Sequence, residues 1–183
     1  IIIIIYMNDF STNYIPKSLS YSDRIVQSKN LKQSTNEYKR GKYIKREKLS
    51  SFVSKPSGHV INAKRMYNID SLTPSPTLSK HTGCPVEVLN KIVNKGRGAY
   101  YSSGSRPNQT PESWGLARLG STLTGGPSSV IDYHILDECK KGSKPLTLAK
   151  KACKKKNKTC NRKVKKTTKY RTIGKKNKSK KTK

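Results

Sequence analysis

Positive charge is crowded into the carboxyl end of this chain. Residues 140–183 hold 21 Lys and Arg residues and no acidic residue, whereas residues 1–139 hold 19 basic residues and all 10 acidic ones. A segment so basic and so poor in apolar side chains cannot bury a core, so we expect 140–183 to be a disordered tail. The formal net charge of the whole chain is +30, and such an excess repels itself until a polyanion neutralises it. DNA or RNA is the expected partner.

The rest of the chain has enough apolar residues for one small domain. Hydrophobic residues make up 32% of the sequence, and ten Tyr outnumber two Phe and one Trp, so tyrosines must fill part of any core. We place the domain at residues 19–139, behind a disordered arm at 1–18, of which residues 8–18 are polar. Residues 1–6 precede Met7 and are interpreted as sequence upstream of the true start, with a β-aggregating extension as the alternative. Five isoleucines are too short a run for a secretory signal or a membrane span, so we expect a protein that is not secreted and has no membrane span.

Two segments carry the start and stop signals of well-formed helices. In the first, Pro85 suits the first helical position and Gly96 is the predicted C-terminal cap. In the second, Thr110 is a suitable N-cap, Pro111 occupies the first turn, and Gly125 ends the helix. The apolar faces of these helices supply the predicted structural residues, which are Leu89, Val93, Trp114 and Leu119.

The remaining segments give weaker signals. Residues 21–40 follow a suitable N-cap, Ser20, and predict a surface helix, and residues 59–69 predict a short one. Apolar and polar residues alternate poorly in residues 42–54, which are expected to form either a short strand or an extended strip. The predicted fold is mainly α, a small helical domain with at most a minor β element and a disordered basic C-terminal tail.

Between the two strongest helices, residues 96–110 (GRGAYYSSGSRPNQT) are predicted to form a loop. Glycine amides without a neighbouring Cβ let an anion approach closely. Arg97 and Arg106 have guanidinium groups that fit phosphate oxygens, and Tyr100 and Tyr101 can stack on bases or sugars. These four residues are candidates for anion or nucleic-acid binding. The alternative is a structural linker, and the segment has no Walker pattern.

The tail supplies the other candidate binding residues. Each phosphate that a cation neutralises releases counterions, so log K should fall with log[salt] at a slope of about −0.9 per contact. Such contacts carry no sequence information. The alternative is a solubilising or localising tail. The candidate residues of the tail are Lys154, Lys155, Lys156, Arg162, Lys163, Lys165 and Lys166.

Patterns for catalysis and metal binding are weak. Residues 128–139 form either a strand or a helix; in a strand, Asp132 and His134 would share a face, as a base and its orienter or as two metal ligands. The four cysteines lack C-x-x-C spacing, so no metal site is predicted, and we expect reduced, unpaired thiols in an intracellular setting. No catalytic residue and no cofactor is assigned. The balance favours a protein that is not an enzyme.

The stretch GRGAYYSSGSRPNQT-x-x-SWG-x-ARL resembles the signature of a domain family of unknown function from nucleocytoplasmic large DNA viruses, the giant viruses, with looser relatives in phages. The resemblance covers about residues 19–139 and leaves out the basic tail. It implies a viral origin. It implies no reaction, ligand or catalytic residue.

We therefore expect a non-enzymatic viral protein that binds nucleic acid without sequence preference through its basic tail and surface. Its expected location is the virion or the cytoplasm or nucleus of an infected host cell. One alternative is an enzyme or ligand-binding module for a phosphorylated or nucleic-acid substrate at the 96–110 loop. Another is a minor capsid or scaffold protein whose tail contacts acidic capsid proteins. The oligomeric state is not indicated.

Overall fold

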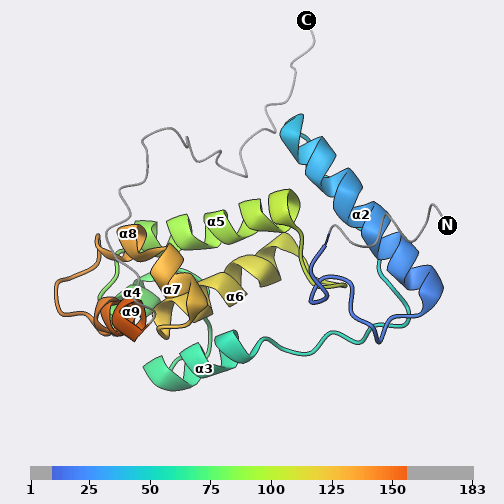
Figure 1. Ribbon diagram of the computed structural model, residues 1–183. Helices are drawn as coiled ribbons and strands as arrows, with labels where there is room; N and C mark the ends of the chain where they lie inside the picture. Colours follow the sequence, from blue (N-terminus) through green and yellow to red (C-terminus); the bar gives the residue numbers. More distant parts are fainter. Residues whose placement is uncertain (1–9, 156–183) are drawn as a thin grey trace, which may run out of the picture.

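The computed structural model describes residues 10–155, and its regular secondary structure is helical (Figure 1). The predicted mainly α fold is confirmed, and this part of the chain contains no strand. Residues 42–49 are extended without regular structure, so the strip alternative holds there. The helices are α2 (Tyr21–Lys39), α3 (Gly58–Tyr67), α4 (Pro76–Thr82), α5 (Val86–Ser103), α6 (Pro111–Leu123), α7 (Pro127–Ile131), α8 (Tyr133–Leu136) and α9 (Lys144–Lys155).

Helices α5 and α6 form the centre of the fold and lie side by side, joined by residues 104–110 (Figure 1). Helix α6 begins where its capping signal predicts. The Thr110 hydroxyl accepts a hydrogen bond from the Ser113 amide at 3.1 Å, and the Ser113 hydroxyl accepts one from the Thr110 amide at 3.0 Å. This reciprocal pair satisfies two amides that a helix start leaves without intrahelical acceptors.

The prediction that α5 ends at Gly96 is wrong, because the helix continues to Ser103 and is capped by Gly104 at φ 93°. Gly96 is buried where α5 crosses α6. A Cβ on Gly96 would lie 2.6 Å from the Cα of Gly115 on α6. The glycine therefore permits close contact between two helix backbones and does not end the helix.

We expect Gly96→Ala to lower the free energy of unfolding by about 1 to 3 kcal/mol, because the added methyl group overpacks the α5–α6 crossing. Gly58→Ala is the matched control, since a Cβ at Gly58 meets no atom within 4 Å. Gly58→Ala should leave stability unchanged or raise it slightly. Urea unfolding monitored by circular dichroism measures both variants. Equal stability of the two would contradict this account of the crossing.

The larger apolar core surrounds α5 and α6. Leu89, Val93 and Leu119 are all buried in it, with side chains 0%, 3% and 0% exposed. Trp114 is half-buried outside this core, and its ring makes an edge-on contact with Tyr14 at a centroid distance of 6.0 Å. The larger core is mostly aliphatic but also buries Tyr67 and Tyr133, as the tyrosine-rich composition predicts. The single tryptophan contacts Tyr14 of the amino-terminal segment.

The disorder predicted from residue 140 onward is wrong for residues 144–155. These residues form α9, which buries Leu146, Ala149 and Cys153 against the larger core. These three residues lie at helical spacing and share the face of α9 that packs on the core, although lysines surround them in the sequence. Lys154 and Lys155 are exposed at its end. The predicted tail residues Lys156, Arg162, Lys163, Lys165 and Lys166 lie outside the described residues.

The disorder predicted for the arm 1–18 is also wrong, where the structure describes it. Ile15 and Leu19 are buried in a second, smaller core together with Leu31 of α2 and Leu49 of the extended strip. Helix α2 itself begins as predicted, with the Ser20 hydroxyl accepting a hydrogen bond from the Asp23 amide at 3.2 Å. The second core therefore joins the amino-terminal arm and α2 to the strip.

The expectation of unpaired thiols is wrong for the described cysteines. Cys84, before α5, forms a disulfide bond with Cys139, after α8, and the two residues are separated by 55 positions in the sequence. Cys153 is disulfide-bonded as well, so none of the cysteines in residues 10–155 is a free thiol. The amide of Lys140 also donates to the carbonyl of Gly83 at 2.9 Å. The chain leading to α9 is thus held at the start of α5.

Candidate nucleic-acid interface

The extended strip, residues 42–49, lies between α2 and the 104–110 loop, and Asn108 of the loop binds its far end. The Asn108 side chain donates to the carbonyls of Leu49 and Phe52 at 2.9 and 2.7 Å and accepts from the Leu49 amide at 2.8 Å. The Asn108 side chain thus forms backbone hydrogen bonds of the kind that a neighbouring strand would form. Asn108 adopts φ 56°, a left-handed conformation that asparagine tolerates better than most residues.

Arg46 fixes the near end of the strip. Its guanidinium donates to the hydroxyls of Ser105 and Ser34, each at 2.9 Å, and to the carbonyl of Tyr100. The same group lies over the Tyr100 ring, 4.0 Å from its centroid, in a cation–π contact. Burial lowers the pKa of Arg46, but a guanidinium stays protonated at physiological pH. The positively charged guanidinium of Arg46 therefore connects the strip to α2 and to the end of α5.

A cavity of about 290 Å³ opens between the strip, the 104–110 loop and the start of α6. Four cations line it, against the single carboxylate of Glu47: Lys45, Arg46, Lys48 and Arg106. Lys45, Lys48 and Arg106 are exposed to solvent. A concave surface with this excess of positive charge attracts anions, and guanidinium and ammonium groups suit phosphate oxygens.

Tyrosines form the aromatic side of the same cavity. The Tyr101 ring is parallel to that of Tyr38 on α2, with centroids 6.0 Å apart, and makes edge-on contacts with Tyr43 at 5.1 Å and Tyr100 at 5.0 Å. Tyr100 is only 3% exposed, whereas Tyr43 is 41% exposed. Burial raises the pKa of Tyr100 and of Tyr101, so both hydroxyls are neutral at physiological pH. Tyr43 thus presents the most accessible ring of the cluster.

The structure brings together three of the four binding residues predicted in the 96–110 segment. Tyr100, Tyr101 and Arg106 line the cavity. Arg97 does not line it, and its guanidinium instead forms an ion pair with Glu112, with Nε donating at 2.8 Å, and a hydrogen bond with Asn94 at 2.9 Å. Residues 96–103 are helical, so the amides of Gly96 and Gly98 donate within α5 rather than to an anion. The loop proper is 104–110.

Sequence reasoning missed the strip as a source of site residues. Tyr43, Lys45, Arg46 and Lys48 all fall in the run KYIKREK. The signal was available in its composition, because cations interleaved with an aromatic residue are typical of nucleic-acid-binding surfaces. No local pattern in the sequence indicates that this run lies against the 104–110 loop.

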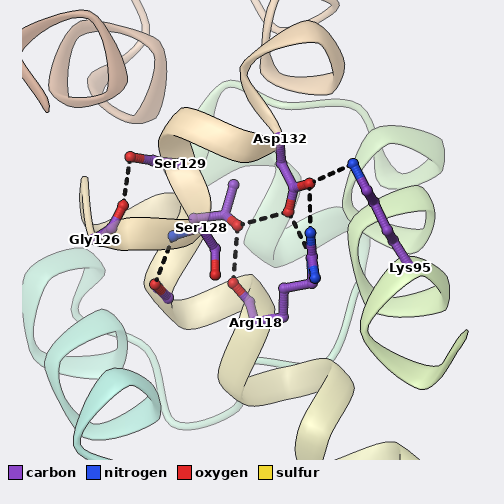
Figure 2. A network of polar contacts seen from close by, with 8 residues as sticks. Lys95, Arg118, Gly126, Ser128, Ser129 and Asp132 are labelled. Carbon is purple, nitrogen blue, oxygen red and sulfur yellow. Dashed lines mark hydrogen bonds and ion pairs between the residues drawn. The ribbon is translucent and has the colours of Figure 1, made fainter. Parts of the chain in front are cut away.

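Asp132 belongs to a separate, buried ion-pair network, shown in Figure 2. Its carboxylate is 0% exposed and accepts from the Arg118 guanidinium of α6 at 2.7 and 2.9 Å and from Lys95 Nζ of α5 at 2.7 Å. Thr122 Oγ1 adds a hydrogen bond at 3.4 Å. Burial alone would raise the pKa of Asp132, but the two cations outweigh it and hold the pKa below its ordinary value.

These contacts make Asp132 a structural residue. It lies between α7 and α8, so the strand alternative for residues 128–139 is wrong, and both carboxylate oxygens face cations rather than an open site. Burial, together with the charge of Lys95, lowers the pKa of His134, so that imidazole is neutral at physiological pH. The network joins α5, α6 and the α7–α8 junction.

Within residues 10–155 no helix has the length and apolar content to span a membrane. Over the same residues no three His, Cys, Asp or Glu side chains gather as a metal-binding group.

The model of a family of unknown function, DUF5824, matches residues 13–129, which include the strip, the 104–110 loop and every residue lining the cavity. No curated protein and no solved structure matches the chain.

Proposed function

The chain belongs to the DUF5824 family of unknown function, and we propose that it binds nucleic acid without sequence preference through the face around the cavity. The observation that carries the proposal is the gathering of Lys45, Lys48 and Arg106 with exposed tyrosine around one concavity. Binding of this kind uses phosphate contacts, which carry affinity but no sequence information. The protein acts in this proposal as a binding protein and not as an enzyme.

The basic tail adds to this binding in our proposal. Lys154 and Lys155 extend the positive charge at the end of α9, and the tail candidates outside the described residues would add further phosphate contacts. Helix α9 packs against α6, α7 and α8 and contributes no residue to the cavity lining. The cavity face and the tail therefore make separable contributions to affinity.

We expect the triple variant Lys45→Gln/Lys48→Gln/Arg106→Gln of the full chain to bind a fluorescein-labelled oligonucleotide more weakly than wild type. Loss of three phosphate contacts should make the slope of log K against log[salt] shallower by about 2 to 3. Fluorescence anisotropy over a salt series measures both quantities.

A charge-matched control is available. Arg65, Lys80 and Lys150 are exposed residues of α3, α4 and α9, away from α2 and the strip (Figure 1). Their change to Gln removes the same three charges, but salt screens interactions beyond about 10 Å, so the slope should stay near that of wild type. If the control lowers affinity as much as the cavity variant, net charge rather than the cavity face explains binding.

A phosphorylated small molecule is the second candidate ligand, and the concave shape of the site favours it. A cavity of about 290 Å³ is close to the lower end of the usual range for ligand pockets. In that case an unlabelled nucleoside monophosphate would displace the labelled oligonucleotide at concentrations far below those at which simple salt does so. Displacement only at equal ionic strength would exclude this candidate.

We further propose that the nucleic acid is viral and that the protein is carried in the virion. The resemblance to the giant-virus signature supports a viral origin. The Cys84–Cys139 disulfide favours the virion over the reducing cytoplasm or nucleus of a host cell, because disulfides persist in oxidising settings such as virion surfaces. A minor capsid or scaffold role is the competing proposal for the same location. Mass spectrometry of purified virions tests packaging.

A further inference from the structure

We propose that the cavity takes one unstacked nucleotide of a single strand, so that the protein binds single-stranded nucleic acid through a base contact that a duplex cannot make. This inference rests on the proposed function and names the form of nucleic acid. Its central residue is Tyr43, which lines the cavity beside Tyr101.

Tyr43 is available for such a contact. Its side chain is 41% exposed, and it belongs to neither apolar core of the described residues. Its ring is already supported from two sides, with edge-on contacts to Tyr38 at 5.8 Å and to Tyr101 at 5.1 Å. An exposed ring held in place by other rings loses little entropy when a base stacks on it.

The charges around Tyr43 suit the backbone of the same strand. Lys45 and Lys48 follow it on the strip, and Arg106 lines the cavity from the 104–110 loop. Single-strand binding sites combine cations that follow the phosphates with aromatic rings that stack on the bases. In a duplex the bases are stacked on one another inside the helix, so only its phosphates can reach this face.

The polar groups in the wall do not predict recognition of a particular base. The Asn108 side chain is engaged by the strip, and the Gln27 amide donates to the carbonyls of Tyr14 at 3.0 Å and Ser105 at 3.3 Å. The Gln109 amide likewise donates to Ser54 Oγ at 3.4 Å and accepts from Ser113 Oγ at 2.8 Å, so all three amide side chains of the lining are engaged within the protein. Every base has a face that can stack, so binding should tolerate any sequence.

The test measures the affinity of the full chain and its variants for labelled oligo(dT), oligo(U) and a DNA duplex of equal length. We expect Tyr43→Ala to weaken binding of the single strands by roughly 5- to 150-fold and to leave duplex affinity unchanged. Tyr43→Phe keeps the ring and should bind like wild type. Tyr21→Ala is the matched control, because Tyr21 on α2 is 62% exposed and does not line the cavity. The oligo(dT) and oligo(U) arms distinguish DNA from RNA.

Each outcome decides something different. A loss for single strands alone, absent in Tyr21→Ala and rescued in Tyr43→Phe, supports the inference. Equal losses for single strands and duplex, or no loss for either, overturns it but leaves phosphate binding by the lysines and Arg106 in place. No binding of any oligonucleotide by the wild-type chain in dilute buffer overturns the proposed function as well. Circular dichroism of each variant checks that the fold is retained.

Discussion

Replacing Asp132 by Asn should lower the free energy of unfolding by about 3 to 5 kcal/mol. The carboxylate is fully buried between the Arg118 guanidinium and Lys95 Nζ, whose side chains are 17% and 24% exposed. The amide keeps the shape of the side chain but removes the negative charge that lies between the two cations. Two partly buried cations then lose this counterion, which costs far more than the loss of one surface ion pair.

The control for this variant is Glu138→Gln. Glu138 forms an ion pair with Lys91, but the two side chains are 49% and 44% exposed, so the pair should contribute less than about 1 kcal/mol. Urea unfolding of both variants gives the comparison. A loss below 1 kcal/mol for Asp132→Asn would show that the buried network does not stabilise the fold as we describe. Binding of nucleic acid by the folded variant should be unchanged, because Asp132 does not line the cavity.

The same network predicts how stability depends on pH. The pKa of Asp132 is lowered in the folded state, so its contribution is fully present above the unfolded value of about 3.9 and is lost as the pH falls through the folded pKa. Wild type should therefore lose stability in acid. Asp132→Asn should lack this part of the acid dependence, so the two unfolding curves should converge at low pH.

Removing the Cys84–Cys139 disulfide is expected to have a comparable effect. The bond closes a loop with a sequence separation of 55, and the chain-entropy model gives about 4 kcal/mol for a loop of that size. The double variant Cys84→Ala/Cys139→Ala isolates this bond. It should unfold at a much lower urea concentration than wild type in the absence of reductant.

A reducing agent provides the control for the disulfide. Reductant should destabilise wild type, and in the double variant any remaining effect of reductant reports on the disulfide of Cys153. Peptide mass spectrometry under non-reducing conditions identifies the pairs directly. Free thiols at Cys84 and Cys139 in the native protein, with no change in stability on reduction, would contradict the assigned bond.

The parts of the fold that follow from local chemistry could be predicted from the sequence. Ser20 and Thr110 cap helices where their side chains reach the amides of the first turn, and those contacts need only residues a few positions away. Gly96 shows where local rules fail. Its sequence context suits a C-terminal cap, but its role depends on Gly115 of another helix, which no local pattern contains.

The residues of the candidate site also fall into two groups: those that a local pattern identifies and those that only the fold brings together. Tyr101 and Arg106 were recognised from residue types in one segment, and both line the cavity. Tyr43 and Lys45 come from a strip that lies about 60 positions away in the sequence and is bound to the loop by contacts such as those of Asn108 and Arg46. The partners of Cys84 and Asp132 are likewise set by tertiary contacts. Pairings over such distances are fixed by the fold and not by any spacing in the sequence.

The most direct test of the central claim is the location of the contact on the protein. Backbone amide chemical shifts of the full chain are recorded while unlabelled oligo(dT) is added. We expect the largest changes in residues 42–48 and 104–110, and small changes in α3 and α4. Changes confined to residues 156–183, with the strip and the loop unaffected, would contradict it.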